Sequence, residues 1–139
     1  MRTDLWPDVA ADEHAREVAE FFAGALPEPA AALLAMGDDG EAVGMIELSI
    51  RATAEGCRTN RVAYVEGWYV ARGARRSGVG RRLVEAAEDW ARAQGCEELA
   101  SDAEIANEAS ARAHLALGFE DAGVIRCFRK DLAGEGVAR

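Results

Sequence analysis

The sequence has little of what would place it in a membrane, outside the cell or on a nucleic acid. Its 139 residues contain no run that approaches the ~20 apolar residues of a membrane-spanning helix, and its first residues lack the apolar core of a signal peptide. The three cysteines, Cys57, Cys96 and Cys127, have no metal-ligand spacing, which predicts a reducing, cytoplasmic setting without disulfides or metal. A formal net charge of −9 is unlike the basic surface that supplies most affinity for nucleic acids. We therefore expect neither a membrane nor a nucleic acid among its partners.

Two common phosphate-binding motifs are also missing. No Gly-Lys-Ser/Thr is present, which excludes the loop that cradles nucleoside triphosphates. Gly78-Val79-Gly80 is followed by Arg81-Arg82, so the third glycine of a dinucleotide-binding fingerprint is absent. Any phosphate site must therefore be of another kind.

The most distinctive stretch, residues 64–83, reads as a strand, a loop rich in Gly and Arg, and the start of a helix. Residues 64–70 are rich in β-branched and aromatic residues, which suit a strand, whereas Val79, Leu83 and Ala87 follow helical spacing. Five of the chain's 16 Lys and Arg residues lie here, namely Arg72, Arg75, Arg76, Arg81 and Arg82. Since a helix N-terminus presents unpaired N–H groups and a positive dipole end, and glycines let an anion approach, the stretch predicts a site for a phosphorylated ligand, such as a diphosphate. A solvated basic loop before an ordinary helix is the alternative.

The rest of the chain alternates between helical and strand patterns. We expect helices at residues 12–25, 78–94 and 107–117, and strands at residues 31–36, 42–51, 64–70, 97–102, 119–121 and 124–130. This order predicts a mixed α/β layer with one strand–helix–strand crossover around the Arg-rich loop. Residues 1–133 are predicted to form one domain and residues 134–139 a frayed tail.

Two carboxylates are candidates for binding a cation. Glu66 lies two residues before Trp68, so we expect both side chains on one face of the strand, and a carboxylate within an apolar strand is unfavourable unless it is paired or wet. Asp102 ends the next strand, and strand ends converge on ligand sites in open α/β sheets. The alternatives are a solvent-facing Glu66 and a helix-capping or loop Asp102. Together the two carboxylates favour an amine-rich ligand.

The spacing of the Arg-rich loop resembles that of a known enzyme superfamily. Arg75-x-x-Gly78-x-Gly80 fits the Arg/Gln-x-x-Gly-x-Gly/Ala pattern that opens the acetyl-CoA helix of the GCN5-related N-acetyltransferases. Further segments resemble one subgroup, the aminoglycoside 6′-N-acetyltransferases: Leu5-Trp6-Pro7-Asp8, Glu47-Leu48-Ser49-Ile50-Arg51, Glu66-Gly67-Trp68, Ser101-Asp102 with Asn107, and His114-Leu115-Ala116-Leu117-Gly118-Phe119. The resemblance extends over about residues 1–132, and only the combination of these segments is specific for the subgroup.

The resemblance implies a mixed, mostly antiparallel central sheet flanked by helices, and acetyl-CoA as the cosubstrate. The central strand of this fold diverges from its neighbour, so that its backbone holds the thioester, with the N–H of Val70 as donor to the carbonyl oxygen. The cosubstrate-binding residues that it implies are Trp68, Tyr69, Val70, Arg75, Arg76, Ser77, Gly78, Val79, Gly80, Arg81 and Asn107. Of these, Asn107 would bond the pantetheine arm.

For the second substrate the resemblance implies a cationic aminoglycoside. Trp6 would line the drug pocket, while Glu66 and Asp102 would bind the amino groups. Glu66 is the candidate base, directly or through a water molecule. The resemblance implies no metal in the reaction.

The sequence departs from the family in two places. Where many members carry a tyrosine that protonates the leaving thiolate, this chain has His114, for which two roles stay open: acid and packing residue. The family also begins with a strand and most of a helix before the Leu-Trp-Pro segment, whereas this chain starts almost at Leu5. We therefore expect the first strand to be absent or the true start to lie upstream. An absent first strand would expose the pairing edge of residues 31–36, and a homodimer is one expected outcome.

Two other functions remain as alternatives. One is acetylation of a different amine, such as a polyamine, an amino acid or a protein terminus. The other is a non-catalytic module that binds acyl-CoA.

Overall fold

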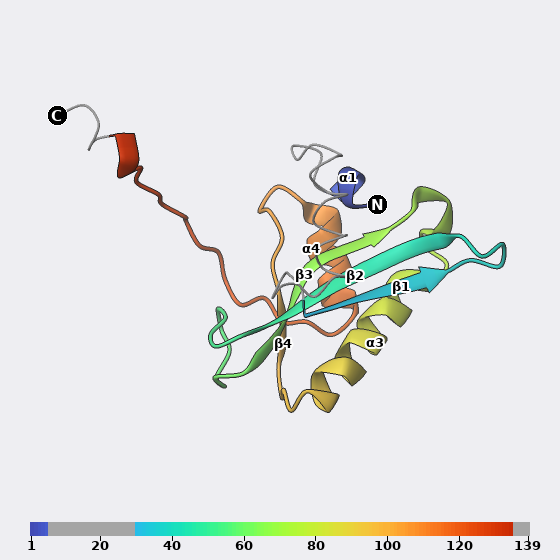
Figure 1. Cartoon of the computed structure of the whole chain (residues 1–139), viewed down its shortest axis with the longest axis horizontal. Helices are drawn as coiled ribbons and strands as arrows, with labels where there is room; N and C mark the ends of the chain where they lie inside the picture. Colours follow the sequence, from blue (N-terminus) through green and yellow to red (C-terminus); the bar gives the residue numbers. More distant parts are fainter. Residues whose placement is uncertain (6–29, 135–139) are drawn as a thin grey trace.

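The structure is a computed structural model, and it describes residues 1–5 and 30–134 (Figure 1). The expected helix at residues 12–25 and the candidate pocket residue Trp6 lie outside the described residues. No helix in the described part of the chain is long and apolar enough to cross a membrane.

Within residues 1–5 and 30–134, four strands form one sheet in the order β1-β2-β3-β4. Strands β1 (Ala31–Met36), β2 (Ala42–Arg51) and β3 (Val62–Val70) pair antiparallel, and β4 (Leu99–Ser101) pairs parallel to β3. The first two strands have the predicted bounds, and Gly40, with φ 82°, supplies the left-handed conformation in the turn between them. The sheet confirms the predicted mixed, mostly antiparallel architecture.

Helix α3 (Val79–Ala93) crosses over between β3 and β4, as the spacing predicted, and covers one face of the sheet (Figure 1). The core between them consists of Ile46, Leu48, Val65, Val79, Leu83, Val84 and Ala87, all nearly or fully buried. The helix approaches the sheet closely at Gly44, where an added Cβ would lie 3.0 Å from methyl groups of both Leu83 and Val79. The packing therefore fixes where the N-terminus of α3 lies relative to β2 and β3.

The other described helices are short. Helix α1 (Arg2–Leu5) and the 3-10 turn η1 (Arg72–Ala74) each form about one turn, and α4 (Glu108–Ala116) follows β4. Through His114, α4 contacts Trp68 on β3, the strand whose core face α3 covers.

Strand β3 contains a bulge at Glu66. Glu47 pairs with Gly67 and Leu48 with Val65, so Glu66 is an extra residue with no partner on β2. An extra residue breaks the alternation of side chains between the two faces. Val65 and Trp68 both pack toward the core under α3, whereas Glu66 bonds Ser49 on the other face. The prediction that Glu66 and Trp68 share a face is therefore wrong.

Strands β3 and β4 pair only briefly and then diverge. Their last pair is Val65 with Ser101, while β3 continues to Val70. The N–H of Ala71 donates to the carbonyl oxygen of Val43 on the β2 side. Because successive N–H groups along a strand point to opposite sides, the N–H of Val70 points to the side that β4 has left. This part of β3 matches the implied divergence of the central strand.

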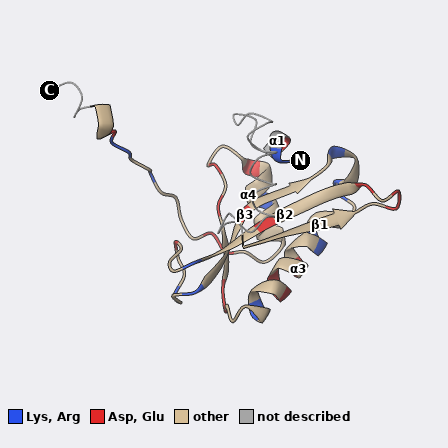
Figure 2. Ribbon diagram, viewed as in Figure 1, with Lys and Arg blue, Asp and Glu red and all other residues tan. Residues whose placement is uncertain are grey.

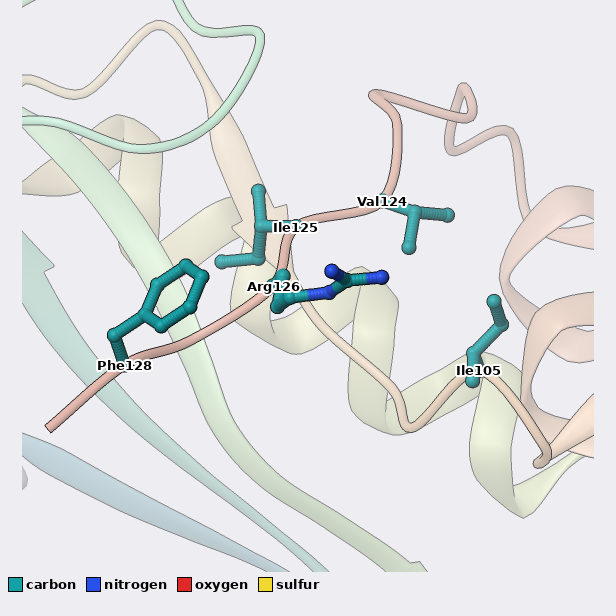
Figure 3. Close-up of a pocket in the computed structure, with 5 residues that line it drawn as sticks. All are labelled: Ile105, Val124, Ile125, Arg126 and Phe128. Atoms are coloured by element: carbon teal, nitrogen blue, oxygen red, sulfur yellow. The ribbon is translucent and has the colours of Figure 1, made fainter.

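The segment after α4 does not form the predicted strands at residues 119–121 and 124–130. Phe119 still packs against the core and Ala122 lies against Gly56, and residues 124–132 then run as an extended arm away from the sheet (Figure 1). A strand forms only where a second strand pairs with it, and the described residues provide no such strand. The arm leaves large apolar side chains exposed, including Val124 (72%), Ile125 (62%) and Phe128 (87%). With Ile105 on the loop after β4, these three and Arg126 line an open hollow (Figure 3).

The loop between β2 and β3 is held by one carboxylate. Glu98 accepts hydrogen bonds from the backbone N–H groups of Arg58 (3.0 Å) and Thr59 (2.8 Å) and from the Thr59 hydroxyl (2.5 Å). These bonds, those from Thr59 first, lower the pKa of Glu98 to about 2. Because these hydrogen bonds form with the ionised carboxylate, they stabilise the fold while Glu98 is charged.

We expect Glu98→Gln to lower the melting temperature at neutral pH. A depressed carboxyl pKa contributes stability above the unfolded value of about 4.3, and that contribution is lost as pH falls toward the folded value. The difference between the two proteins should therefore shrink between about pH 4.5 and 2. Thermal unfolding followed by circular dichroism across this range measures it, and a constant difference would show that the charge of Glu98 contributes nothing.

Candidate active site

The two candidate carboxylates lie in one polar network on the face of the sheet opposite α3. Arg51 on β2 donates two hydrogen bonds to Glu66, from Nε to Oε2 (3.0 Å) and from Nη2 to Oε1 (2.8 Å), and Ser49 Oγ also donates to Oε2. The Arg51 guanidinium lies 3.5 Å from the centre of the Tyr64 ring, and the Tyr64 hydroxyl donates to Asp102 Oδ2 at 2.5 Å. The structure thus brings Glu66 and Asp102 into one cluster, as the sequence predicted.

Tyr64 holds Asp102 as a neutral donor. Burial, followed by the hydrogen bond to Asp102, raises the pKa of the Tyr64 hydroxyl well above its usual range. The ring is only 7% exposed, whereas Asp102 itself is exposed. Asp102 therefore presents a carboxylate to solvent from a fixed position.

Sequence reasoning missed three members of this cluster, Ser49, Arg51 and Tyr64. The alternation along β2 places Ser49 and Arg51 on one side of that strand, which was an available signal. Their contact with Glu66 was not predictable, because it depends on the bulge in β3.

The Arg-rich loop and the start of α3 form an open, positive corner of the molecule. Figure 2 shows basic residues at the β3–α3 loop and at the start of α3. Gly78 is the N-cap residue of α3, with φ 85°; it makes no side-chain capping bond, and the first turn contains no acidic residue. Four arginines, at positions 72, 75, 76 and 81, are exposed around it, and Arg76 itself has a positive φ of 64°. The first N–H groups of α3 are thus available to an anion.

Several predicted cosubstrate residues have defined partners. Arg75 Nε donates to the carbonyl oxygen of Val70 (2.8 Å), which ties the loop to the end of β3. Ser77 Oγ donates to the carbonyl oxygen of Ala74. Asn107 Oδ1 accepts from the N–H of Ser110 (3.1 Å) and caps α4, so only its amide N–H₂ remains to donate to a ligand.

The aromatic part of the site lies between β3 and α4. The His114 ring makes edge contacts with Trp68 (5.2 Å between centroids) and Phe119 (5.0 Å). His114 Nδ1 lies 2.7 Å from the carbonyl oxygen of Ser110, which can only accept, so Nδ1 carries a proton. Nε2 is 2.8 Å from Ser101 Oγ and, in neutral histidine, accepts from it. These partners favour packing over the acid role.

The described residues include one buried polar atom without a partner, the indole Nε1 of Trp68. An unmade hydrogen bond of this kind costs about 1–3 kcal/mol. Gly80 faces the same ring: a Cβ there would lie 3.3 Å from Trp68 Cζ2. The small residue at position 80 therefore lets the start of α3 lie against Trp68.

Two contacts anchor α1 to the sheet beside the bulge. Arg2 Nη1 lies 2.6 Å from both carboxylate oxygens of Glu47, a residue only 5% exposed. The Tyr69 hydroxyl donates to Asp4 Oδ2 (3.0 Å). Because the Tyr69 hydroxyl is engaged by α1, a role in cosubstrate binding falls to its backbone.

Comparison with known proteins identifies close relatives. The family described as Acetyltransferase (GNAT) family matches residues 1–119. The chain is 55% identical over 132 residues to the aminoglycoside N(6′)-acetyltransferase type 1 of Klebsiella aerogenes, covering 95% of this chain and 87% of the relative. It is 41% identical over 133 residues to the protein of the same name from Serratia marcescens, covering 95% and 89%.

Solved structures similar to this chain carry the same enzyme name as these relatives. One is AAC(6′)-Iy in complex with the bisubstrate analog CoA-S-monomethyl-acetylneamine, with a TM-score of 0.83, 33% identity, and coverage of 94% of this chain and 87% of that one. Another is AAC(6′)-IG from Acinetobacter haemolyticus, with a TM-score of 0.82, 36% identity, and coverage of 94% and 88%.

The open, positive corner formed by the Arg-rich loop and the start of α3 leads to a prediction for Gly78. An aspartate there places a negative charge at the N-terminus of α3, so we expect Gly78→Asp to weaken acetyl-CoA binding at least ~10-fold, about 1.4 kcal/mol. Gly78→Ala is the matched control, because it adds the same Cβ at positive φ, into open space, without the charge. Calorimetric titration with acetyl-CoA measures both. Equal affinities for the aspartate and alanine variants would show that no anion binds at this corner.

Proposed function

The chain belongs to the acetyltransferase (GNAT) family, and on this premise we propose that it is an aminoglycoside 6′-N-acetyltransferase. It would transfer the acetyl group of acetyl-CoA to the 6′-amino group of an aminoglycoside antibiotic and so confer resistance. The observation that carries the proposal is the cluster of Glu66 and Asp102, which directly follow the last pair of β3 with β4, Val65 with Ser101. The names of the relatives support the same substrate class.

Acetyl-CoA would bind along β3 and the start of α3. The first N–H groups of α3 and the side chains of Arg75, Arg76 and Arg81 suit the diphosphate, while the backbone of residues 68–70 suits the pantetheine arm and the thioester. The N–H of Val70 points toward the side that β4 has left, so it is the donor that would bond the carbonyl oxygen as negative charge develops on it.

The amine would approach from the carboxylate side. An aminoglycoside 6′-amine is mostly protonated at neutral pH and must lose a proton before its nitrogen attacks the thioester carbon. We assign the proton to Glu66, directly or through one water molecule, and ammonium binding to Glu66 and Asp102. The bulge sends Glu66 and the core residue Trp68 to opposite faces, and this geometry favours the relay through water.

When the carbon–sulfur bond breaks, the electron pair leaves with the sulfur as a thiolate. His114 is the candidate that would protonate it. Both ring nitrogens already have partners, so Nε2 would have to give up Ser101 before it could act. The contacts therefore support a thiolate that leaves without a proton from His114, which packs against Trp68.

One assay separates the proposed function from its alternatives. Purified protein is mixed with acetyl-CoA and kanamycin, thiol release is followed, and the acetylated position is identified by NMR. We expect turnover and 6′-acetylation. Turnover only with a polyamine, an amino acid or a peptide terminus would instead establish another amine acetyltransferase, and CoA binding without any turnover would establish a non-catalytic module.

The roles of the two carboxylates can be distinguished by uncharged variants of equal size. Glu66→Gln should lower kcat by roughly 10²–10⁴, the usual contribution of a general base, and remove the acidic limb of the pH–rate profile. Asp102→Asn should raise the KM for the drug while the KM for acetyl-CoA stays constant. If Glu66→Gln raises only the drug KM and keeps the pH limb, then Glu66 binds the cation and is not the base.

We also propose that the protein is a homodimer joined by the arm, residues 124–132. Isolated copies would expose the arm's apolar side chains, which a second copy could cover. The strand pattern of residues 124–130 gives the arm the means to pair with another sheet edge, and within the described residues β4 has a neighbour on one side only.

Sedimentation velocity tests this assembly. We expect a dimer that Phe128→Asp converts to monomers, because a charge at this apolar position opposes its burial. Leu34→Asp is the matched control: Leu34 is also exposed (57%), but it lies on the edge strand β1. Dissociation by Leu34→Asp alone would instead assign the contact to β1.

A further inference from the structure

A cation of the protein itself lies in the acidic cluster. Arg51 makes a two-point contact with Glu66 and lies over the ring of Tyr64, whose hydroxyl holds Asp102. The carboxylates that suit a substrate's ammonium groups are therefore already in contact with a guanidinium. With two negative charges and one positive charge, the three groups Glu66, Asp102 and Arg51 have a formal charge of −1.

Glu66 has little capacity left for a further donor. Its Oε2 accepts from Ser49 and from Arg51 Nε, and its Oε1 accepts from Arg51 Nη2. A two-point guanidinium–carboxylate contact is among the stronger hydrogen-bonded pairs. An arriving ammonium must displace Arg51 or accept a poorer place on the carboxylate.

The displacement is nevertheless feasible. The side chain of Arg51 is 42% exposed and that of Glu66 is 24% exposed, so water and a ligand can reach the pair. Solvent weakens the attraction between exposed charges. When Arg51 moves aside, it can be solvated at the surface.

We propose that Arg51 is a specificity-determining residue, because its guanidinium occupies the position on Glu66 that a substrate ammonium would take. A substrate with several ammonium groups can bond Glu66 and Asp102 together, which offsets the loss of the Arg51–Glu66 pair. A monoamine gains one such contact and must still break the pair. Arg51 thus favours polycations over monoamines. This inference rests on the proposed function.

The experiment compares a polycation with a monoamine at equilibrium. Calorimetry measures the Kd of kanamycin and of 6-amino-6-deoxyglucose, a sugar with a single 6-amino group, for the unchanged protein and for Arg51→Ala. A hydrogen bond to a charged group is worth enough to change a Kd about tenfold, so we expect the monoamine to bind roughly tenfold more tightly to the variant. Kanamycin should gain only about threefold, so that the preference for it falls.

Two further variants isolate the mechanism. Arg92→Ala removes the same charge from an exposed side chain (70%) in the last turn of α3, away from the cluster. It should leave the ratio of the two Kd values unchanged. In a Glu66→Gln background, Arg51→Ala should change either Kd by less than about twofold, because the pair no longer exists. An undiminished effect in that background would overturn the inference, since Arg51 would then act only as a distant charge.

Weaker binding of both amines to Arg51→Ala would also overturn it, because Arg51 would then serve to position Glu66. Turnover of kanamycin by the unchanged protein reports on the proposed function separately. Turnover combined with an unchanged Kd ratio in Arg51→Ala overturns the inference alone, and absence of turnover with every aminoglycoside overturns the proposed function.

Discussion

Glu66 is one residue more than regular pairing of β2 with β3 would contain, and the contacts of its carboxylate with Ser49 and Arg51 depend on that extra residue. Before the bulge, Val65 points into the core; after it, Trp68 does the same, although three positions separate them. The inserted carboxylate points to the opposite face, toward Ser49 and Arg51. The backbone direction changes with the side chains, so that the N–H of Val70 points away from β2. One extra residue therefore places the Glu66 carboxylate beside Arg51 on one face, while the N–H of Val70 points to the edge where β3 and β4 diverge.

Most secondary-structure elements could be predicted because their signals are local. The hairpin of β1 and β2 follows from strand patterns on either side of a Gly-rich turn, and α3 follows from helical spacing between Gly78 and Gly95. The candidate carboxylates were found because each is a polar residue within or beside an apolar strand. Their proximity to each other also followed from strand order, since β3 and β4 are neighbours.

The features that could not be predicted all depend on distant partners. The predicted face of Glu66 was wrong because strict alternation of side chains along a strand assumes regular pairing with β2. The strands expected at residues 119–121 and 124–130 were wrong because a strand pattern describes a preference, while a strand needs a neighbour to bond. The link between Arg51 and Glu66 joins residues 15 positions apart on adjacent strands, and no spacing rule within either strand indicates it.

The close approach at Gly44 restricts how this sequence can vary. A Cβ at that position would lie 3.0 Å from the Val79 and Leu83 methyl groups and 3.1 Å from the Tyr69 carbonyl oxygen, so even alanine requires these neighbours to move by a few tenths of an ångström. Val79 and Leu83 belong to the first turns of α3, so a shift of the helix there would carry its first N–H groups away from the end of β3. In a library of random variants, substitutions at Gly44 should therefore be depleted by selection for activity even among proteins that still fold. A buried glycine that brings no side chain to the site would then behave in sequence data like an active-site residue.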